Sequence, residues 1–324
     1  MNQTLPSVTV IIAARPNQAD IKAVTAGREL DYPKDKLEIL VARGKQPSVQ
    51  RNTAIRAARG ELIYFLDDDS VAPAGNLKKA VGAFADPKVK MIGGPNICPP
   101  DAPMLEQVFA LVHASFLAFF SSHARYASVG KVRESSEKEL ILCNLIARKE
   151  PLLELGGFDE ALYPNEENAL MDELQKRDGK LIYDPQFTVY RRPRNTLKAF
   201  CKMLLNYGRG RAEQFRLHST LGSAPNFVPP LFCVYLLALP FLFLVPPLFG
   251  KLALIPLAIY VIALLLQAAA LSVHGGIIRS LCAIPLIMLT HILYGVGFWR
   301  GLFTPLKPVA ARPKVEVVLE NIPL

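Results

Sequence analysis

The sequence has few cysteines and no pattern that would pair them. The five cysteines are scattered singly, at positions 98, 143, 201, 233 and 282, and no CxxC pair occurs. This spacing argues against a disulfide framework and against a zinc site, so it favours a reducing compartment. The first apolar run, VTVII, has only the length of a strand. No secretory signal is therefore expected, and the N-terminal part should stay cytosolic.

Charged residues are scarce in one long region. Of the 324 residues, 51 % are apolar, and the mean hydropathy is +0.24. Apolar runs alternate with charged segments up to about Phe215, whereas 227–299 is almost entirely apolar. This difference predicts a soluble domain followed by a membrane region. The expected parts are a cytosolic domain, a membrane region and a basic tail, over residues 1–216, 217–300 and 301–324.

The apolar region divides into three candidate membrane spans. Each has about the 20 residues that a crossing helix needs, at about 227–249, 252–273 and 277–299. The tail carries Lys307, Arg312 and Lys314, and these cations favour a cytosolic C-terminus. A cytosolic tail requires an even number of crossings, which conflicts with three spans. Either one segment is interfacial or re-entrant, or the tail breaks the positive-inside rule.

Strands and helices alternate in the N-terminal part. The runs SVTVIIAARP, LEILVAR, ELIYFL and VKMIGG are expected strands, and ADIKAVTAGREL and SVQRNTAIRAARG are expected helices, the second with Ser48 as N-cap. This order predicts an α/β fold: a mixed, mostly parallel sheet with helices on both faces and ligands at the carboxyl ends of its strands. The apolar stretch 104–120 is short for a span and is interpreted as a buried or an interfacial helix.

Three consecutive acids follow the strand ELIYFL. Side chains alternate along an extended chain, so Asp67 and Asp69 should point one way and Asp68 the other. Adjacent carboxylates repel unless a cation offsets their charge. Carboxylate oxygens suit Mg²⁺ or Mn²⁺ shared with substrate phosphates, so the acids predict a metal–diphosphate site. The alternative is simple capping of the next helix, for which three acids are more than is needed.

A second acidic pair, Glu166 and Glu167, precedes the expected helix NALMDELQKR. Carboxylates at a helix N-terminus can simply be surface residues that the helix dipole stabilises. Beside a metal–diphosphate site they become candidates for a general base, which removes the proton from an attacking hydroxyl. One carboxylate of the pair would be enough for that role.

Much of the net charge of +9 lies in residues 191–216, just before the apolar region. Nucleic acid is one possible partner of such a basic stretch. Its position beside the membrane region favours anionic lipid headgroups instead, and no nucleic-acid partner is expected.

These motifs resemble a family 2 glycosyltransferase of the GT-A fold with a C-terminal membrane anchor. The resemblance rests on VTVIIAARP, QRNTAIRAARGELIYFLDDDS, IGGP, CNLIARKEPLLELGGFDE, NEEN and VYRRPRNTLKAFCKMLLNYGRGRA, in this order over about residues 6–216. It implies a Rossmann-like GT-A domain, and the sequence is most similar to enzymes that assemble exopolysaccharide or lipid-linked glycans. The implied activity is metal-dependent, inverting transfer of one sugar, a hexose, from a nucleotide sugar to a lipid-linked saccharide or polyprenyl-phosphate acceptor. It also implies a multi-pass protein of the cell membrane with its catalytic domain in the cytosol.

The resemblance also assigns roles to single residues. LDDDS matches the DxD motif, which implies that Asp67 and Asp69 hold the metal and that Glu167, with Glu166 beside it, acts as the base. The implied contacts to the nucleotide sugar come from Ala13, Arg15, Arg51, Asn52, Asp67 and Asp68. The implied contacts to the acceptor or its phosphate come from Asn144, Arg191, Arg192, Arg209 and Arg211.

The sequence departs from the family pattern at two places. The stretch after the second strand, LVARGKQPS, has Ala42 and Arg43 where the family usually has an aspartate near the base or ribose. No residue at this place therefore indicates the nucleotide, and UDP is expected only as the default of the family. The QxxRW motif of processive synthases is missing and Trp299 is the single tryptophan, which favours single-sugar transfer over polymerisation.

Three alternatives accompany this prediction. The first is a processive polysaccharide synthase. The second is a nucleotidyltransferase, which would need a glycine-rich phosphate loop, but IIAARPNQAD contains no glycine. The third is a non-catalytic membrane scaffold of the same fold, which would have lost the metal acids or the base, and both are present.

Overall fold

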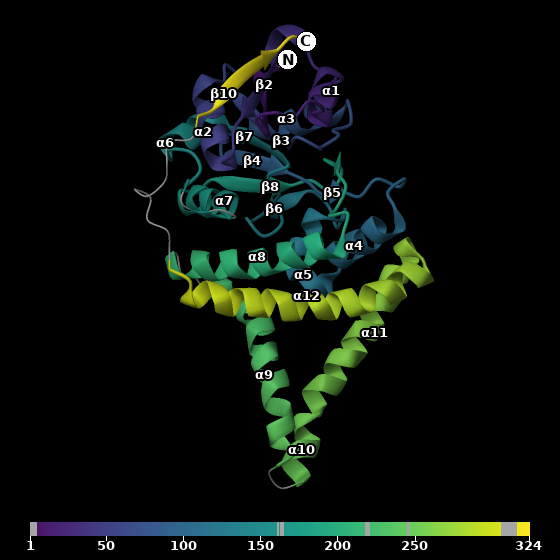
Figure 1. Cartoon of the computed structure of the whole chain (residues 1–324). Coiled ribbons are helices and arrows are strands. Elements are labelled where there is room, and N and C mark those ends of the chain that lie inside the picture. The colour runs from purple at the N-terminus through teal and green to yellow at the C-terminus, as the bar shows by residue number, and fades with distance from the viewer. Residues whose placement is uncertain (1–4, 161, 163–164, 218–220, 245–246, 306–315) are drawn as a thin grey trace. The chain divides into compact units, whose positions relative to one another are not determined.

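The computed structural model describes all of the chain except residues 1–4, 161, 163–164, 218–220, 245–246 and 306–315 (Figure 1). The chain forms two compact units. The first comprises residues 1–99, 124–192 and 307–324, and the second comprises 100–123 and 193–306. The C-terminal segment therefore belongs to the same unit as the N-terminus. The tail cations Lys307, Arg312 and Lys314 lie outside the described residues.

The first unit is built on an eight-stranded sheet with the strand order β10-β2-β1-β3-β7-β4-β8-β6. Its strands are β1 Val8–Ala14, β2 Leu37–Arg43, β3 Leu62–Asp67, β4 Val89–Gly93, β6 Arg133–Ser135, β7 Asn144–Arg148, β8 Lys180–Tyr183 and β10 Val318–Ile322. Strands β1, β2, β3, β4 and β8 run in one direction and β6, β7 and β10 in the other. The sheet is mixed and mostly parallel, as predicted. A separate parallel pair joins β5 Asn96–Ile97 to β9 Val189–Tyr190.

Helices cover both faces of this sheet, which confirms the α/β prediction. The helices of this unit are α1 Lys22–Arg28, α2 Pro47–Ala57, α3 Asn76–Val81, α6 Lys149–Glu154 and α7 Glu166–Lys176, with 3-10 turns at Lys34–Lys36 and Gly82–Ala85. Side chains alternate along each strand, so two apolar clusters form, one on each face. One cluster joins the sheet to α1 and α3, and the other joins it to α2, α6 and α7.

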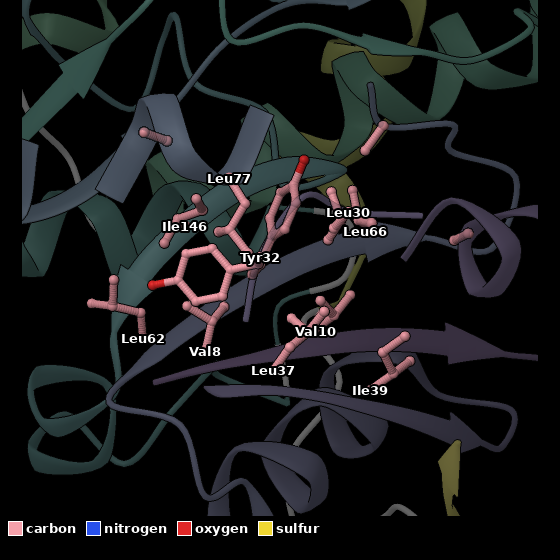
Figure 2. Packing of buried hydrophobic residues seen from close by; sticks show 14 of the residues in the cluster. Val8, Val10, Leu30, Tyr32, Leu37, Ile39, Leu62, Leu66, Leu77 and Ile146 are labelled. Carbon is pink, nitrogen blue, oxygen red and sulfur yellow. The ribbon is translucent and has the colours of Figure 1, made fainter. Parts of the chain in front are cut away.

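Figure 2 shows the first of these clusters from close by. Val8 and Val10 of β1 lie with Leu62 of β3 and with Leu77 of α3, all at most 1 % exposed. Because strands buried on both faces need apolar residues at consecutive positions, the sequences VTVIIAA and LIYFL read as nearly unbroken apolar runs. The rigid sheet holds the ends of its strands in fixed register, which positions the site described below.

The second unit is helical. It contains α4 Met104–Ala114, α5 Phe116–Phe119, α8 Leu197–Leu217, η4 Leu221–Phe227, α9 Val228–Leu242, α10 Pro247–Ala253, α11 Ile255–Gly275 and α12 Ile277–Phe303, and the 3-10 turn η3 Phe120–Arg125 straddles the boundary at residue 123. Among the described residues, three helical stretches are long and apolar enough to cross a membrane: Ala224–Leu242, Leu248–Gly275 and Ile277–Phe303. This agrees with the three segments expected from hydropathy.

Two helices of the second unit, α8 and α12, pack along each other (Figure 1). Their backbones approach closely at glycines: a Cβ added to Gly208 would lie 2.0 Å from the Tyr294 carbonyl oxygen, and one added to Gly297 would lie 2.2 Å from that of Leu205. The apolar residues of α8, such as Phe200, Met203 and Leu204, are buried, and its basic residues occupy the remaining positions. Helices α9 and α11 instead extend away from α12 and meet at α10 (Figure 1).

Two local predictions were wrong. The stretch 104–120 is not one helix, because α4 ends at Ala114 and Ser115 takes an extended conformation and caps α5 with its side chain. Ser48 is not the N-cap of α2. The N-cap is Gln46, and Pro47 occupies the first turn, where its fixed φ suits a helix start and its missing N–H costs nothing.

Candidate active site

The carboxyl ends of three parallel strands lie side by side at one edge of the sheet. In the register of the sheet, Ala14 at the end of β1 lies opposite Arg43 at the end of β2, and Ala13 lies opposite Asp67 at the end of β3. Ligands of open α/β sheets bind at this edge. The three acids after β3 therefore stand where a ligand is expected.

Arg191 holds the acids after β3. Its Nη1 lies 3.0 Å from Asp67 Oδ2, and its Nε donates to Asp69 Oδ1 at 2.5 Å. Asp67 and Asp69 thus face the same side, as their alternation predicts. Burial alone would lower the pKa of Arg191, but the charges of the acids raise it well above its usual value. The backbone fixes this pairing, because Tyr190 just before Arg191 exchanges two 2.9 Å hydrogen bonds with Val71.

A second arginine, Arg51 of α2, connects the acids to the pair on α7. Its Nη2 lies 3.2 Å from Asp67 Oδ1, and its Nη1 lies 3.2 Å from Glu166 Oε1. These residues come from three separate elements: Asp67 ends β3, Arg51 lies within α2, and Glu166 begins α7. The fold therefore joins the predicted metal acids and Glu166, the neighbour of the predicted base Glu167, in one ionic network.

Glu166 is the most buried carboxyl of this network. It is 2 % exposed, and its second oxygen accepts the Asn165 backbone N–H at 3.0 Å. Burial, followed by the neighbouring charge of Glu167, raises the pKa of Glu166 to about 7, although Arg51 opposes this shift. Asn165 begins the helix with φ 141°, an unusual conformation for a residue other than glycine. A carboxyl with such a pKa can exchange a proton near neutral pH.

Two predicted contact residues serve the scaffold in this structure. Asn52 donates to the Phe158 carbonyl oxygen at 2.9 Å and accepts the Phe158 N–H at 2.8 Å, which holds the GGFDE turn. Only glycine fits at position 157, where φ is +83° and a Cβ would lie 2.3 Å from Asn52 Oδ1. Asn144 is fully buried and joins Tyr64 to the Phe187 carbonyl oxygen.

The other predicted site residues lie as follows. Ala13 is half-buried in β1, Arg15 is exposed just after it, and the carbonyl oxygen of Asp68 accepts the Ala23 N–H at the start of α1. Glu167 is half-buried in the first turn of α7, and Arg192 is exposed. Arg209 and Arg211 belong to α8 of the second unit, where Arg209 lies 3.4 Å from Glu213 and Arg211 donates to Gln214.

Asp67 and Asp69 are the residues that would hold a divalent cation shared with a substrate, and in this structure Arg51 and Arg191 pair with both oxygens of Asp67. Asp67 and Asp69 supply hard carboxylate oxygens on one side of the strand end. Within the part of the chain that the structure describes, no three His, Cys, Asp or Glu side chains form a metal-ligating group. A protein that offers only two carboxylates suits Mg²⁺ or Mn²⁺, because these ions take their remaining ligands from phosphate oxygens and water.

Sequence reasoning missed the contacts at the ends of β1 and β2. The buried Gln50 of α2 donates to the carbonyl oxygens of Ala14 at 2.8 Å and Ala42 at 2.6 Å. Arg43 reaches Glu320 of β10 at 2.7 Å. The run VEVVLENI, rich in β-branched residues, was a usable signal for a C-terminal strand, but its partner strand could not be read from it.

Comparison with known proteins agrees with this geometry. The family model described as "Glycosyltransferase like family 2" matches residues 1–205. This match covers more than half of the chain and contains the strands and acids of the site. The chain belongs to this family, which confirms the resemblance noted in its motifs.

Two further comparisons give individual relatives. The pre-mycofactocin glycosyltransferase of Mycobacterium tuberculosis, from strains CDC 1551 and H37Rv, is 24 % identical over 164 residues. The match covers 51 % of this chain and only 34 % of the relative, about a third of its length. Among solved structures, the mannosyltransferase PcManGT from Pyrobaculum calidifontis in complex with GDP-Man and Mn²⁺ has a TM-score of 0.55 at 19 % identity. That likeness covers 92 % of this chain and 87 % of PcManGT and shows that the fold is GT-A.

Proposed function

We propose that this protein is a membrane-anchored, inverting glycosyltransferase that moves one sugar from a nucleotide-sugar donor to a lipid-linked acceptor. The observation that carries the proposal is the ionic network of Asp67, Asp69, Arg51, Arg191 and Glu166 at the carboxyl edge of the sheet. It combines acids for a metal–diphosphate, cations for the phosphates and carboxyls for a base. The membership of the family supports this assignment, and the GDP-Man bound by PcManGT supports a nucleotide sugar as donor.

The chemistry follows from the charges at this edge. The acceptor hydroxyl oxygen forms a bond to the anomeric carbon while the bond from that carbon to the diphosphate oxygen breaks, and in-line attack inverts the centre. Arg191 orients Asp67 and Asp69, and Arg51 adds a second cation beside the departing diphosphate. When bound there, Mg²⁺ or Mn²⁺ would supply further neutralisation of the leaving group. The acceptor proton passes to a carboxylate of α7.

Glu167 is our proposed base, with Glu166 as the competing residue. Glu166 is held by Arg51 and by the Asn165 N–H, which favours a positioning role for it. Glu167 is half-buried beside it in the same turn. The raised pKa of Glu166 is the argument for the opposite assignment, because a base works best when its pKa lies near the operating pH.

The membrane anchor is also a proposal, and chain connectivity limits its form. The chain leaves the first unit after residue 192 and returns to it with β10, which pairs with β2. A folded polar sheet does not straddle a bilayer, so both ends of the segment 193–306 lie on one side. The number of crossings between them is therefore even. The same argument excludes α4–α5 as a single span, because residues 99 and 124 belong to the first unit as well.

We propose that α9 and α11 cross the membrane and that α12 lies along its surface. The apolar windows of the stretches through α9 and α11 are each 11 % buried within the protein, as expected for helices surrounded by lipid, whereas that of α12 is 39 % buried. Helix α12 packs along α8, whose Lys198, Lys202 and Arg211 could not enter hydrocarbon. A helix tied lengthwise to such a partner stays at the interface. The predicted conflict between three spans and a cytosolic tail then disappears.

Transfer to lipid is the direct test of the activity. Membranes containing the protein would be incubated with radiolabelled UDP- and GDP-sugars and with polyprenyl phosphate, and the lipid fraction would be extracted. We expect label in the lipid fraction with one donor, and none with the Asp69→Ala variant. Release of nucleotide without labelled lipid would contradict the acceptor, and a growing polymer would favour a processive synthase. No release with any nucleotide sugar would contradict the enzyme.

Cysteine labelling tests the topology. In a chain without its native cysteines, Lys251→Cys at the α10 turn should react with a membrane-impermeant maleimide in intact cells. Arg279→Cys and Arg300→Cys, at opposite ends of α12, should both react only after permeabilisation, as should the control Asp31→Cys in the first unit. Reaction of just one end of α12 in intact cells would mean that α12 crosses.

A further inference from the structure

The C-terminal strand lies at the outer end of the edge where the donor is proposed to bind (Figure 1). Outward from the acids after β3 the sheet continues through β1 and β2 to β10. Neighbouring strands lie about 4.8 Å apart, so the end of β2 is about 10 Å from the end of β3. A nucleotide whose diphosphate meets Asp67 would extend its nucleoside part along this edge, toward either β2 or β7. The β7 side is filled by the buried Asn144.

One side chain connects the end of β2 to the loop after β1. The Nη1 of Arg43 donates to the carbonyl oxygen of Gln18 at 2.8 Å and to that of Arg15 at 3.3 Å. The Nε of the same guanidinium donates to Glu320 Oε1 at 2.7 Å. The guanidinium of Arg43 thus contacts the loop through Nη1 and β10 through Nε. The side chain of Arg43 is 20 % exposed and that of Glu320 is 39 % exposed, so solvent screens this contact in part.

The loop that Arg43 holds is the one that would receive the nucleoside. Residues 15–21 connect β1 to α1 and begin at Arg15, a predicted donor contact. Within the loop, Gln18 accepts the Arg15 N–H at 3.4 Å and donates to the Asp20 carbonyl oxygen at 3.1 Å. Two carbonyl oxygens of this loop accept hydrogen bonds from Arg43, and that of Arg15 also accepts the Gln18 N–H at 3.3 Å. Arg43 in turn pairs with an anion that comes from more than 270 positions away in the sequence.

We propose that β10 is part of the donor site and that Glu320 is a positioning residue for the nucleoside end of the donor. Glu320 fixes Arg43, and Arg43 holds the loop 15–18 in the conformation that accepts the nucleoside. This inference rests on the proposed function, since it takes the donor to lie along this edge. It assigns to the C-terminal segment a role in nucleotide affinity that a plain edge strand would not have.

The alternative is that β10 only protects the edge of the sheet. Two other contacts tie the segment down without touching the loop: Asn321 Nδ2 lies 3.5 Å from Glu38 Oε1, and the Nε of Arg28 donates to the Pro323 carbonyl oxygen at 3.0 Å. Asn321 is therefore a matched control. It lies next to Glu320 on the same strand, and its replacement weakens the strand without disturbing Arg43.

Nucleotide binding by the full-length protein in detergent tests the proposal. The probes are UDP, GDP, CDP and ADP, measured by calorimetry for the wild type, Glu320→Ala, Glu320→Gln and Asn321→Ala. We expect Glu320→Ala to weaken the preferred nucleotide about tenfold, equivalent to about 1.4 kcal/mol. Glu320→Gln keeps the strand and an acceptor oxygen but not the charge, so it should show a smaller loss of affinity than Glu320→Ala. Asn321→Ala should bind the nucleotide as the wild type does.

Arg43→Ala gives a second and independent readout. If Glu320 acts through Arg43, the double variant Arg43→Ala/Glu320→Ala should bind nucleotide no more weakly than Arg43→Ala alone. Two results would overturn the inference and leave the proposed function standing. One is wild-type nucleotide affinity in both Glu320→Ala and Glu320→Gln. The other is an equal loss of nucleotide affinity in these variants and in Asn321→Ala. If the wild type bound none of the four nucleotides, the proposed function would fail first. If Glu320→Ala does not fold, the nucleotide affinities of Glu320→Gln and Asn321→Ala test the inference instead, and a loss in Glu320→Gln alone supports it.

Discussion

The two units of this protein differ in where their charged side chains lie. The first unit gathers acids and arginines into one partly buried network at a strand edge, where Arg51 and Arg191 neutralise Asp67, Asp69 and Glu166. The second unit carries many of its cations on α8, while α9 and α11 present side chains such as Leu237 and Leu266 to the surroundings at 73 % and 67 % exposure. The first arrangement suits chemistry on an anionic substrate, and the second suits a lipid surface. If the two units have these separate roles, substitutions in the first unit should impair the reaction, and substitutions in the second should impair the interaction with the lipid acceptor.

The largest effect is expected at the acids. Asp69→Ala or Asp67→Ala should abolish transfer without unfolding the protein, because stabilisation of the leaving diphosphate is worth several kcal/mol. Excess EDTA should stop the wild type for the same reason. Transfer assays with and without EDTA provide the measurement. Asp31→Ala is the control, since Asp31 pairs with Lys78 on the surface of the same unit. Full activity in EDTA would disprove the metal's role.

The next effect concerns the base. Glu167→Gln keeps the shape of the side chain but cannot accept a proton, so turnover should fall by about 10²–10⁴-fold while nucleotide binding is retained. Single-turnover transfer and nucleotide binding would be compared with the same measurements on Glu166→Gln. If Glu166→Gln were the damaging change and Glu167→Gln harmless, the base would be Glu166.

A smaller effect is expected on stability at different pH values. The folded pKa of Glu166 is raised to about 7, so its stabilising contribution is complete below the unfolded pKa near 4.3 and is lost as pH rises through about 7. The wild type should therefore lose more stability than Glu166→Gln between pH 5 and pH 8, by at most about 3 kcal/mol. Urea unfolding at the two pH values measures this, with Glu173→Gln on the same helix as control, since the side chain of Glu173 is 44 % exposed and pairs with Lys176 at the surface. Parallel pH profiles would refute it.

The smallest effect belongs to the second unit. Arg209→Ala and Arg211→Ala should raise the apparent KM of a polyprenyl-phosphate acceptor about three- to tenfold and leave the donor KM unchanged, because arginine binds phosphate oxygens in a bidentate way. Steady-state kinetics in detergent remove the attraction of the bilayer, and Lys198→Ala on the same helix is the control. An acceptor KM equal to that of the wild type would mean that these arginines only face headgroups.

Much of the local structure could be predicted from the sequence, except for the N-cap of α2 and the break between α4 and α5 at Ser115. Strand–helix alternation, the apolar strands and the position of the acids after β3 were all predicted, because side-chain period and turn residues decide them within a few positions. The pairing of β10 with β2 was not, since it joins residues some 280 positions apart and depends on which edge is open. The roles of Asn52 and Asn144 also needed the fold. Their side chains satisfy buried backbone groups that no motif reveals.

Arg191 shows what could be predicted from the sequence and what required the structure. The resemblance of the sequence implied a contact from Arg191 to the acceptor or its phosphate, and this role stays a prediction. Its partners could not be known, because the contact to Asp69 spans 122 positions and depends on the bridge between Tyr190 and Val71. Both roles are compatible, since a guanidinium that orients carboxylates also lies beside the diphosphate they would serve.

The return of the chain to its first sheet means that the helices are an insertion and not an appendage. A fragment that stopped at residue 192 would lack β10 and would leave the backbone groups of β2 from Ile39 to Arg43 unpaired along an apolar edge. Such edges invite pairing with other copies and aggregation. A soluble catalytic fragment should therefore carry residues 316–324 joined by a short linker to residue 192, so that the edge of the sheet stays covered.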